Sequence, residues 1–307
     1  MSELDNQTGR WQGDRAFVVD RKEKESETVS SFYLVPEDGG PLASYKPGQF
    51  LSFKLDIPGQ DKPVGRTYTI SDSPRTAGTM AAKWGNGAHY RLSIKREPAP
   101  KDHPEYPPGL SSTCFHEHVE VGTVLQVGTP TGDFYLHEDR DGPVVLLSGG
   151  VGLTPMISML NHLVDQGAKR PVWFIHGVQN GDEQAFGRHV RDLAEAHDTV
   201  TTHIVYAEPG PGDVKGRDYD DEGFITLAML EDLLPGPDCD FYLCGPPPFM
   251  KALYNALLGW GVDESRIYYE FFGPATVLKD SGDTPAQEKP DAAPAPADTA
   301  NGMTVTF

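Results

Sequence analysis

The sequence predicts a β domain of barrel type followed by an α/β domain with a parallel sheet. Three observations predict it. The first half contains short β-rich runs separated by Gly, Pro and Asp clusters, and the second half alternates strand-like apolar runs with helical patterns. The 307 residues are also enough for two domains of ordinary size. With 38% hydrophobic residues, most of the chain can bury a core.

The β half holds its runs at residues 15–20, 29–35, 49–55, 67–71, 89–95 and 124–127. Their spacing is typical of an antiparallel barrel. One short helix is expected over residues 112–118, between the last two runs. The polar, Gly-containing stretch 138–142 predicts the boundary, so that the barrel domain covers residues 10–140 and the second domain 141–278.

The second half predicts strands at residues 144–147, 172–176, 201–206, 240–244 and 267–270, and helices at 155–164, 184–196, 227–233 and 249–258. Gly167 is the expected stop of the first helix. Strands that alternate with helices predict a parallel sheet with helices on both faces.

Composition excludes several functional classes. With 26 Lys and Arg against 45 Asp and Glu, the formal charge of -19 repels a phosphate backbone, so nucleic acid is not an expected partner. The chain has no apolar run of the roughly 18 residues that a transmembrane helix needs, and its start lacks a signal-peptide pattern. A cytoplasmic protein without a membrane partner is therefore expected. The cysteines, Cys114, Cys239 and Cys244, form no CxxC pair, so neither a metal site nor a disulfide framework is expected.

The tail, residues 279–307, differs from the rest. Residues 279–302 are rich in Ala, Pro and Asp and hold no aromatic residue, which predicts a disordered linker. Residues 303–307 resemble the opening of a strand, so the tail is expected to lead into a missing ferredoxin-like domain. A naturally frayed terminus is the alternative.

A glycine-rich turn follows the first strand of the second half. Glycines such as Gly150 and Gly152 let a backbone approach a phosphate, and the following helix offers unpaired N–H groups. Thr154 is expected to cap this helix and Pro155 to occupy its first position. The alternative is a tight strand-to-helix turn without a ligand.

Cys244 ends a strand before Gly245 and Pro246, which places it at the carboxyl edge of a parallel sheet, where ligands bind. Simple packing is the alternative, and it is the expectation for Cys239. The terminal motif from Glu270 to Gly273 sets a carboxylate beside aromatic rings. It indicates either proton handling over a flat cofactor or a terminal strand with core aromatics.

Two candidate anion sites lie in the β half. In the strand Arg66-Thr67-Tyr68-Thr69, alternation places Arg66 and Tyr68 on one face and the two threonines on the other. An Arg can bind phosphate oxygens and a Tyr ring can stack on a heterocycle, although a surface Arg beside a core Tyr is the alternative. Hydroxyls at 111–113 lie at the start of the short helix and predict a second anion site.

In this order the motifs resemble the ferredoxin–NADP reductase superfamily over residues 11–278, and most closely the reductase half of flavohaemoglobins and oxygenase reductases. The matching segments are Pro47-Gly48-Gln49-Phe50, Arg66-Thr67-Tyr68-Thr69, Gly149-Gly150-Val151-Gly152-Leu153-Thr154-Pro155, Cys244-Gly245-Pro246 and Glu270-Phe271-Phe272-Gly273-Pro274. The resemblance implies a six-stranded antiparallel flavin-binding barrel, then a parallel-sheet α/β domain that binds NAD(P).

The resemblance also implies roles for individual residues. Catalytic roles fall to Thr69, Cys244 and Glu270. FAD and the nicotinamide nucleotide would be bound by Phe50, Arg66, Thr67, Tyr68, Thr69, Ser112, Thr113, Gly150, Val151, Gly152, Thr154, Pro155, Cys244, Gly245, Pro246, Phe271, Phe272 and Gly273. Thr69 stands where a serine is commoner, which keeps the hydroxyl.

We therefore expect an NAD(P)H-dependent flavoprotein oxidoreductase that passes electrons from NADH or NADPH through FAD. Its expected acceptor is a one-electron carrier such as a [2Fe–2S] ferredoxin-like domain or an oxygenase component. The alternatives are a direct reductase of free flavin or ferric chelates, and a flavin-binding interaction module without turnover.

Overall fold

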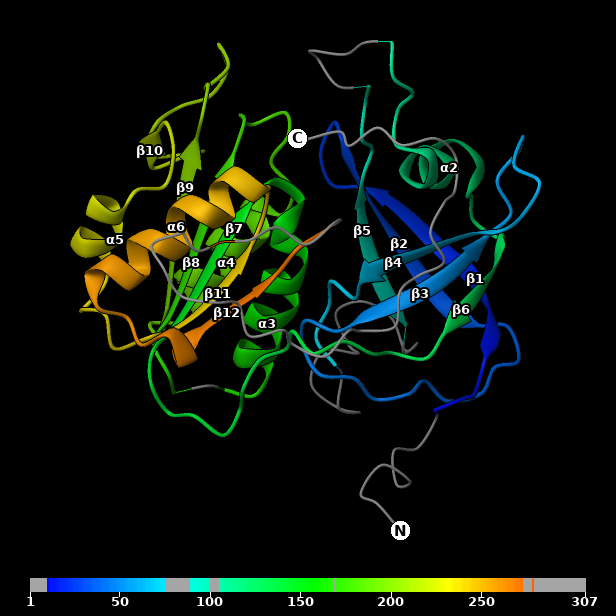
Figure 1. The fold of residues 1–307 in the computed structure, drawn as a ribbon, viewed down its shortest axis with the longest axis horizontal. Coiled ribbons are helices and arrows are strands. Elements are labelled where there is room, and N and C mark those ends of the chain that lie inside the picture. The colour runs from blue at the N-terminus through cyan, green and yellow to red at the C-terminus, as the bar shows by residue number, and fades with distance from the viewer. Residues whose placement is uncertain (1–9, 75–88, 100–104, 168, 273–277, 279–307) are drawn as a thin grey trace.

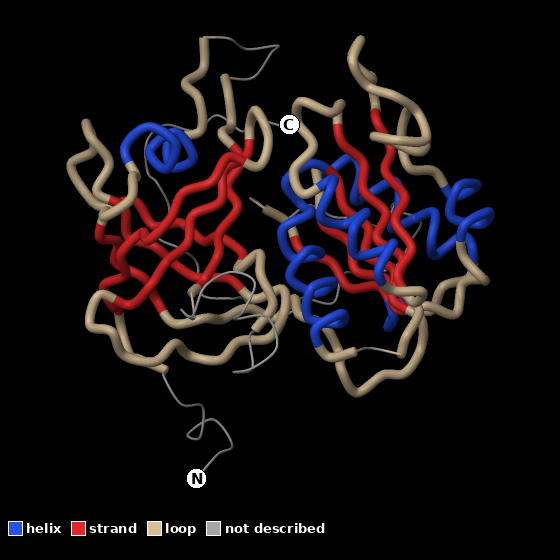
Figure 2. The backbone as a smooth tube through the Cα atoms, turned by 180° about the vertical axis from the view of Figure 1, so that it is seen from behind, coloured by secondary structure: helices blue, strands red, loops and turns tan. Residues whose placement is uncertain are grey.

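The computed structural model describes residues 10–74, 89–99, 105–167, 169–272 and 278. Figure 1 shows two lobes side by side, each built around one sheet. Figure 2 shows the same lobes from behind, with helices concentrated around the sheet of the second lobe. The predicted linker 279–307 and Gly273 lie outside the described residues.

The first lobe is a six-stranded antiparallel sheet in the order β4-β3-β6-β1-β2-β5. Its strands are β1 (Asp14–Lys24), β2 (Val29–Pro36), β3 (Phe50–Leu55), β4 (Val64–Thr69), β5 (Tyr90–Lys95) and β6 (Val124–Gly128). A bridge between Ile70 and Leu92 of β5 brings the two edge strands together, as a barrel requires. The helix α2 (Leu110–His118) follows β5.

The core of this lobe is aromatic. The ring of Phe115, on α2, contacts the rings of Phe32, Phe53 and Tyr68 at centroid distances of 5.2, 5.8 and 5.0 Å. These edge-on contacts hold α2 against the sheet. The Tyr68 contact makes α2 a neighbour of β4.

The second lobe is a six-stranded sheet in the order β10-β9-β8-β7-β11-β12, with all paired strands parallel. Its elements are β7 (Val144–Gly149), a 3₁₀ turn (Gly150–Gly152), α3 (Leu153–Asp165), β8 (Val172–Val178), α4 (Gly187–Ala196), β9 (Val200–Tyr206), β10 (Asp221–Glu222), α5 (Leu227–Leu233), β11 (Asp240–Cys244), α6 (Pro247–Trp260), a second 3₁₀ turn (Glu264–Arg266) and β12 (Ile267–Glu270).

Two apolar layers sandwich this sheet. Leu146, Phe174 and Tyr242 pack under α3 and α4, whereas the residues one position along, such as Leu147 and Phe241, pack under α5 and α6. Strands buried on both faces explain why the sequence shows continuous apolar runs here. The fold class predicted from the sequence is confirmed.

Three local features differ from the sequence prediction. The strand β10 was not predicted, because a strand of two residues is too short to show an alternation of apolar and polar residues. The helix predicted from residue 184 starts at Gly187, after Phe186 takes a left-handed φ of 58°. The assignments of Thr154 as helix cap and of Pro155 as the first helical residue are wrong. The helix α3 begins at Leu153, so Pro155 is its third residue, and the Thr154 hydroxyl donates to the Val151 carbonyl over 3.2 Å.

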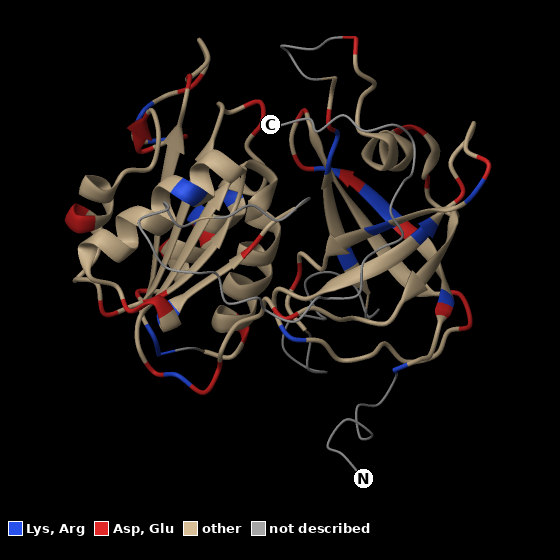
Figure 3. Ribbon diagram, in the orientation of Figure 1, with Lys and Arg blue, Asp and Glu red and all other residues tan. Residues whose placement is uncertain are grey.

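The colouring of the ribbon in Figure 3 shows that Lys, Arg, Asp and Glu residues occur in both lobes. No helix in the described part of the chain is long and apolar enough to cross a membrane.

Candidate active site

The parallel sheet brings four polar side chains into one row at its carboxyl edge. Ser148 of β7 is in register with His176 of β8 and with Cys244 of β11, and Cys244 is in register with Glu270 of β12. Residues in register on parallel strands share a face, so the row continues across four strands. Ser148, His176 and Cys244 are fully or almost fully buried.

Burial removes charge from this row. It lowers the pKa of His176 to about 4 and raises the pKa of the Cys244 thiol well above its ordinary value. Burial, with a smaller effect from the Asp133 carboxylate, raises the pKa of Glu270 to about 7. At neutral pH the imidazole and the thiol are therefore uncharged, and Glu270 exchanges a proton much nearer neutral pH than an ordinary carboxyl does. The row therefore carries little charge, although its four side chains are polar.

His176 and Ser148 were missed as site residues by the sequence reasoning. The Ser148 hydroxyl lies 2.9 Å from His176 Nδ1, while His176 Nε2 is buried without a hydrogen-bond partner in the described part of the chain. Glu270 Oε2 is likewise buried without a hydrogen-bond partner there. Only the pairing register of strands far apart in sequence could have revealed the row.

The glycine turn after β7 packs backbone to backbone against the turn after β11. A Cβ at Gly152 would overlap the Cys244 carbonyl oxygen, and a Cβ at Gly245 would lie 3.0 Å from the Gly149 nitrogen. Gly150 differs, because it has a φ of +52° and a Cβ at this position would meet nothing within 4 Å. Of these glycines, Gly150 is therefore the one whose surroundings leave room for a ligand phosphate beside the start of α3.

The register of β4 agrees with the predicted alternation. Arg66 pairs with Phe53 and Tyr68 with Leu51, so the two lie on one face of the strand, and Thr69 pairs with Phe50 on the other face. Arg66 is exposed and donates to the Gly65 carbonyl over 2.7 Å, and Thr67 is exposed too. Thr69 is 6% exposed. Because the Tyr68 ring rests on Phe115, β4 and α2 are neighbours.

The start of α2 has hydroxyl groups suited to an anion. Ser112 is engaged internally: its hydroxyl donates to the Gly109 carbonyl over 3.1 Å and accepts from the Glu97 N–H over 3.2 Å. The hydroxyls of Ser111 and Thr113 are buried without a hydrogen-bond partner in the described residues. No side chain caps the helix. Unpaired buried hydroxyls at an uncapped N-terminus fit the phosphates of a flavin dinucleotide.

The predicted site residues thus fall into two groups. Phe50, Arg66, Thr67, Tyr68, Thr69, Ser112 and Thr113 belong to the barrel, and Gly150, Val151, Gly152, Thr154, Pro155, Cys244, Gly245, Pro246 and Glu270 lie at the sheet edge. Of the two aromatic residues after β12, Phe271 packs on Tyr269 with a centroid distance of 5.8 Å, whereas Phe272 is 47% exposed. The roles of these residues stay predictions.

Comparison with known proteins agrees with this geometry. Residues 146–254 match the family model described as the oxidoreductase NAD-binding domain. The chain is 42% identical over 273 residues to the flavohemoprotein of Halalkalibacterium halodurans, and 43% identical over 265 residues to that of Chromobacterium violaceum. These alignments cover 89% and 86% of this chain, but 63% and 62% of the relatives. The chain therefore spans a little under two thirds of these relatives' length.

A solved structure covers the same part of the fold. The flavohem-like FAD/NAD binding domain of nitric oxide dioxygenase from Vibrio cholerae is 36% identical, with a TM-score of 0.73, and the match covers 86% of this chain and all of that domain. The chain belongs to the ferredoxin–NADP reductase superfamily. Phthalate dioxygenase reductase, at 20% identity and a TM-score of 0.61 with 86% of this chain and 70% of that one covered, shares the superfamily's fold.

Membership in the superfamily confirms the predicted enzyme class, an NAD(P)H-dependent flavoprotein oxidoreductase. It also confirms FAD as the cofactor and NADH or NADPH as the nucleotide. Superfamily members that resemble this chain have the two-lobe arrangement seen here, which explains why the two groups of site residues come from different lobes.

Proposed function

We propose that the chain transfers a hydride from NADH or NADPH to FAD and passes the electrons singly to a separate one-electron carrier. The carrier is a [2Fe–2S] ferredoxin-like domain or an oxygenase component. The observation that carries the hydride half is the buried, weakly charged row of side chains at the sheet edge, where the glycine turn packs against the turn after β11. The proposal assigns the flavin to residues 10–140 and the nucleotide to residues 141–278.

Each group of residues then has a task. Arg66 and the start of α2, with the backbone N–H of Ser112 and the hydroxyl of Thr113 among its donors, bind the flavin phosphates, and Tyr68 lies along the ring system. Thr69 holds the ring by a hydrogen bond. FAD, when bound, supplies the conversion of a two-electron donor into single electrons.

On the nucleotide side, Gly150, Gly152 and Thr154 surround the pyrophosphate, and Cys244 lies under the nicotinamide. Glu270 holds or releases a proton beside it, as its raised pKa allows. Phe272 covers the flavin until the nicotinamide replaces it. Catalysis by this arrangement is positioning, which excludes water and aligns two rings.

The acceptor half rests on the relatives. Phthalate dioxygenase reductase, a structural neighbour at 20% identity, is a modular structure for electron transfer from pyridine nucleotides to [2Fe–2S], and an iron–sulfur carrier is therefore the first candidate. The flavohemoprotein relatives, at about 40% identity, favour a haem protein as the second candidate. The chain spans about 63% of the first of these relatives.

Two measurements test the proposal. Flavin released by heat is expected to be FAD, since the barrel has two separate anion sites, and recovery of FMN alone would refute that assignment. The chain with NADH should reduce ferricyanide quickly and cytochrome c slowly, and an added ferredoxin should raise the cytochrome c rate many-fold. Fast reduction of cytochrome c that ferredoxin does not improve would favour direct reduction of small acceptors. A yellow protein that neither nucleotide can reduce would favour a binding module.

A further inference from the structure

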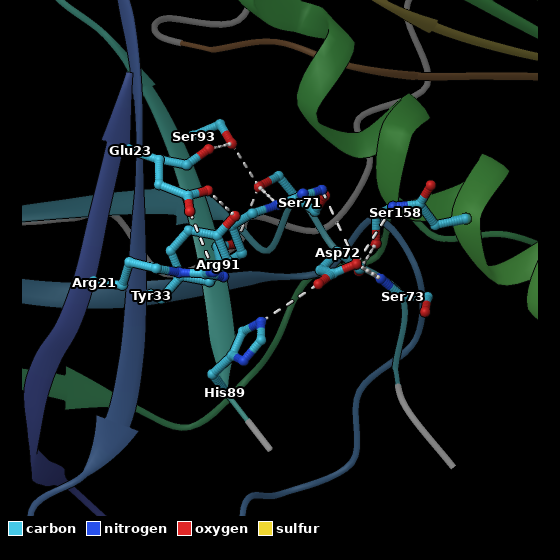
Figure 4. Close-up of polar contacts among 12 residues, drawn as sticks. Arg21, Glu23, Tyr33, Ser71, Asp72, Ser73, His89, Arg91, Ser93 and Ser158 are labelled. Atoms are coloured by element: carbon cyan, nitrogen blue, oxygen red, sulfur yellow. Dashed lines mark hydrogen bonds and ion pairs between the residues drawn. The ribbon is translucent and has the colours of Figure 1, made fainter. Parts of the chain in front are cut away.

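A barrel residue, Asp72, holds the helix that starts at the nucleotide turn. Asp72 lies just after β4, three residues beyond Thr69, and is buried at the boundary between the lobes. Figure 4 shows Asp72 next to Ser158 of α3. The glycine turn runs directly into α3, so anything that fixes this helix also fixes the turn.

Asp72 and its neighbour contact one stripe of α3. The Ser158 hydroxyl donates to the Asp72 carbonyl oxygen over 2.6 Å, and Asn161 Nδ2 donates to Asp72 Oδ1 over 3.3 Å. One turn further along, Asp165 accepts a hydrogen bond from the Ser73 hydroxyl. Ser158, Asn161 and Asp165 are spaced by three and four residues, which places them on the same side of the helix.

On the barrel side Asp72 is held as firmly. Its Oδ1 accepts the Ser73 N–H over 2.9 Å, and its carbonyl oxygen accepts the Tyr45 hydroxyl over 2.8 Å. Two cationic or titratable groups flank the carboxylate: His89 Nε2 lies 3.6 Å from Oδ2, and Arg91 Nη2 lies 4.0 Å from Oδ1. Figure 4 shows these two groups beside it. A buried polar network with this many contacts stabilises a single arrangement.

Apolar packing supports the same contact. Val29, Phe134 and Leu136 belong to the buried cluster that includes α3. Gly48 approaches the helix so closely that a Cβ there would lie 2.8 Å from Met159 Cε, and its φ of +105° also favours glycine. The helix is thus packed between its own sheet and the barrel.

We propose that Asp72 is a positioning residue for hydride transfer, which sets the nucleotide turn at a fixed distance from the flavin strand. The inference rests on the proposed function. Thr69 at the end of β4 and Gly150 before α3 belong to different lobes, and the Asp72 contacts connect the segment after β4 to α3. Reacting atoms must lie about 3–3.5 Å apart, and a displacement of about 1 Å can cost 10²-fold in rate.

Single-turnover reduction of the purified flavoprotein by NADH under anaerobic conditions tests this. Asp72→Ala is expected to lower the limiting rate of flavin reduction by about tenfold or more, with flavin content and the NADH dissociation constant little changed. Asp72→Asn keeps Oδ1 as an acceptor for Asn161 and should recover most of the rate. Deuterium at the transferred position of NADH should slow the variant at least as strongly as the wild type, because hydride transfer stays limiting.

The matched control is Glu138→Gln. Glu138 is exposed and contacts the same helix, since its Oε1 lies 2.6 Å from His162 Nε2, but it is not part of the barrel sheet. This variant should keep the wild-type rate. If Asp72→Ala fails to bind flavin, Asn161→Ala, which removes one hydrogen bond to Asp72, decides instead, with a rate several-fold lower expected.

Two outcomes would overturn parts of the account separately. If the wild type is reduced normally and the variants lose only thermal stability, Asp72 is merely structural and the positioning proposal fails. If neither NADH nor NADPH reduces the wild type, the proposed function itself fails.

Discussion

Thr69 and Cys244 are the two side chains that we place closest to the reacting rings. Thr69→Ala should retain flavin but slow its reduction about fivefold, since one hydrogen bond of about 1 kcal/mol is lost. Cys244→Ala should slow reduction without changing the fold, because the buried thiol is neutral and acts by shape. Anaerobic rapid mixing with NADH measures both rates. A wild-type rate in either variant would remove that residue from the hydride-transfer step.

Glu270 should make stability depend on pH. Its pKa of about 7 in the folded protein, caused first by burial and then by Asp133, exceeds the ordinary value of 4.5. Between these two values the folded state binds more protons than the unfolded state, so this group lowers stability as pH rises. Glu270→Gln should therefore lose less stability than the wild type between pH 4.5 and 7. Thermal unfolding of both proteins across this range measures it, and parallel curves would contradict the assignment.

At the scale of elements, the glycine turn can pack against the turn after β11 only because Gly152 has no side chain. Gly152→Ala should destabilise the protein by about 1–3 kcal/mol, because its Cβ would overlap the Cys244 carbonyl oxygen. Gly259→Ala, in α6 with nothing within 4 Å, is the matched control and should be neutral or stabilising. Urea unfolding compares them. If the two variants have the same free energy of unfolding, the glycine turn and the turn after β11 can move apart without destabilising the protein.

The loop after β8 should make the enzyme prefer NADH to NADPH. Residues 177–183 hold no Lys or Arg, and the carboxylate of Asp213 accepts the N–H groups of Gly181 and Gly210 over 3.1 and 2.7 Å. Carboxylates beside the loop repel a 2′-phosphate. Arg188, further along the chain, is the positive charge that could oppose this preference. Its side chain is 94% exposed, and its Nε lies 3.7 Å from the Asp192 carboxylate. A preference of about tenfold needs only ~1.4 kcal/mol. The ratio of kcat/KM values decides, and an advantage for NADPH would reverse the prediction.

Sequence periodicity predicted most elements because each buried strand or amphipathic helix carries its own pattern. α5, β11 and β12 begin and end where the sequence indicated. The strand β10 is too short to show a period. The helix α4 starts later than predicted because Phe186 takes a left-handed conformation, which the sequence pattern does not reveal. The site was predicted where motifs are contiguous. The Ser148–His176 pair and the Asp72 contacts were missed because they join residues that only the tertiary fold brings together.

At the scale of the whole molecule, the two lobes divide the proposed reaction. In the proposed function, Arg66 and the uncapped start of α2 in the barrel bind the flavin, and the weakly charged row at the sheet edge receives the nicotinamide. The helix α3 belongs to both, since it packs on its sheet and contacts the barrel through Asp72. Direct hydride transfer between two rings requires that the two lobes keep a fixed position relative to each other.

The measurement that tests the central claim most directly is anaerobic mixing of the purified yellow protein with NADH and with NADH deuterated at the transferred position. We predict that the flavin absorbance is lost in one dominant phase, with one NAD⁺ formed for each flavin, and that deuteration slows this phase. If the flavin stays bound and oxidised with both NADH and NADPH, the sheet edge does not deliver a hydride to it, and the account is contradicted.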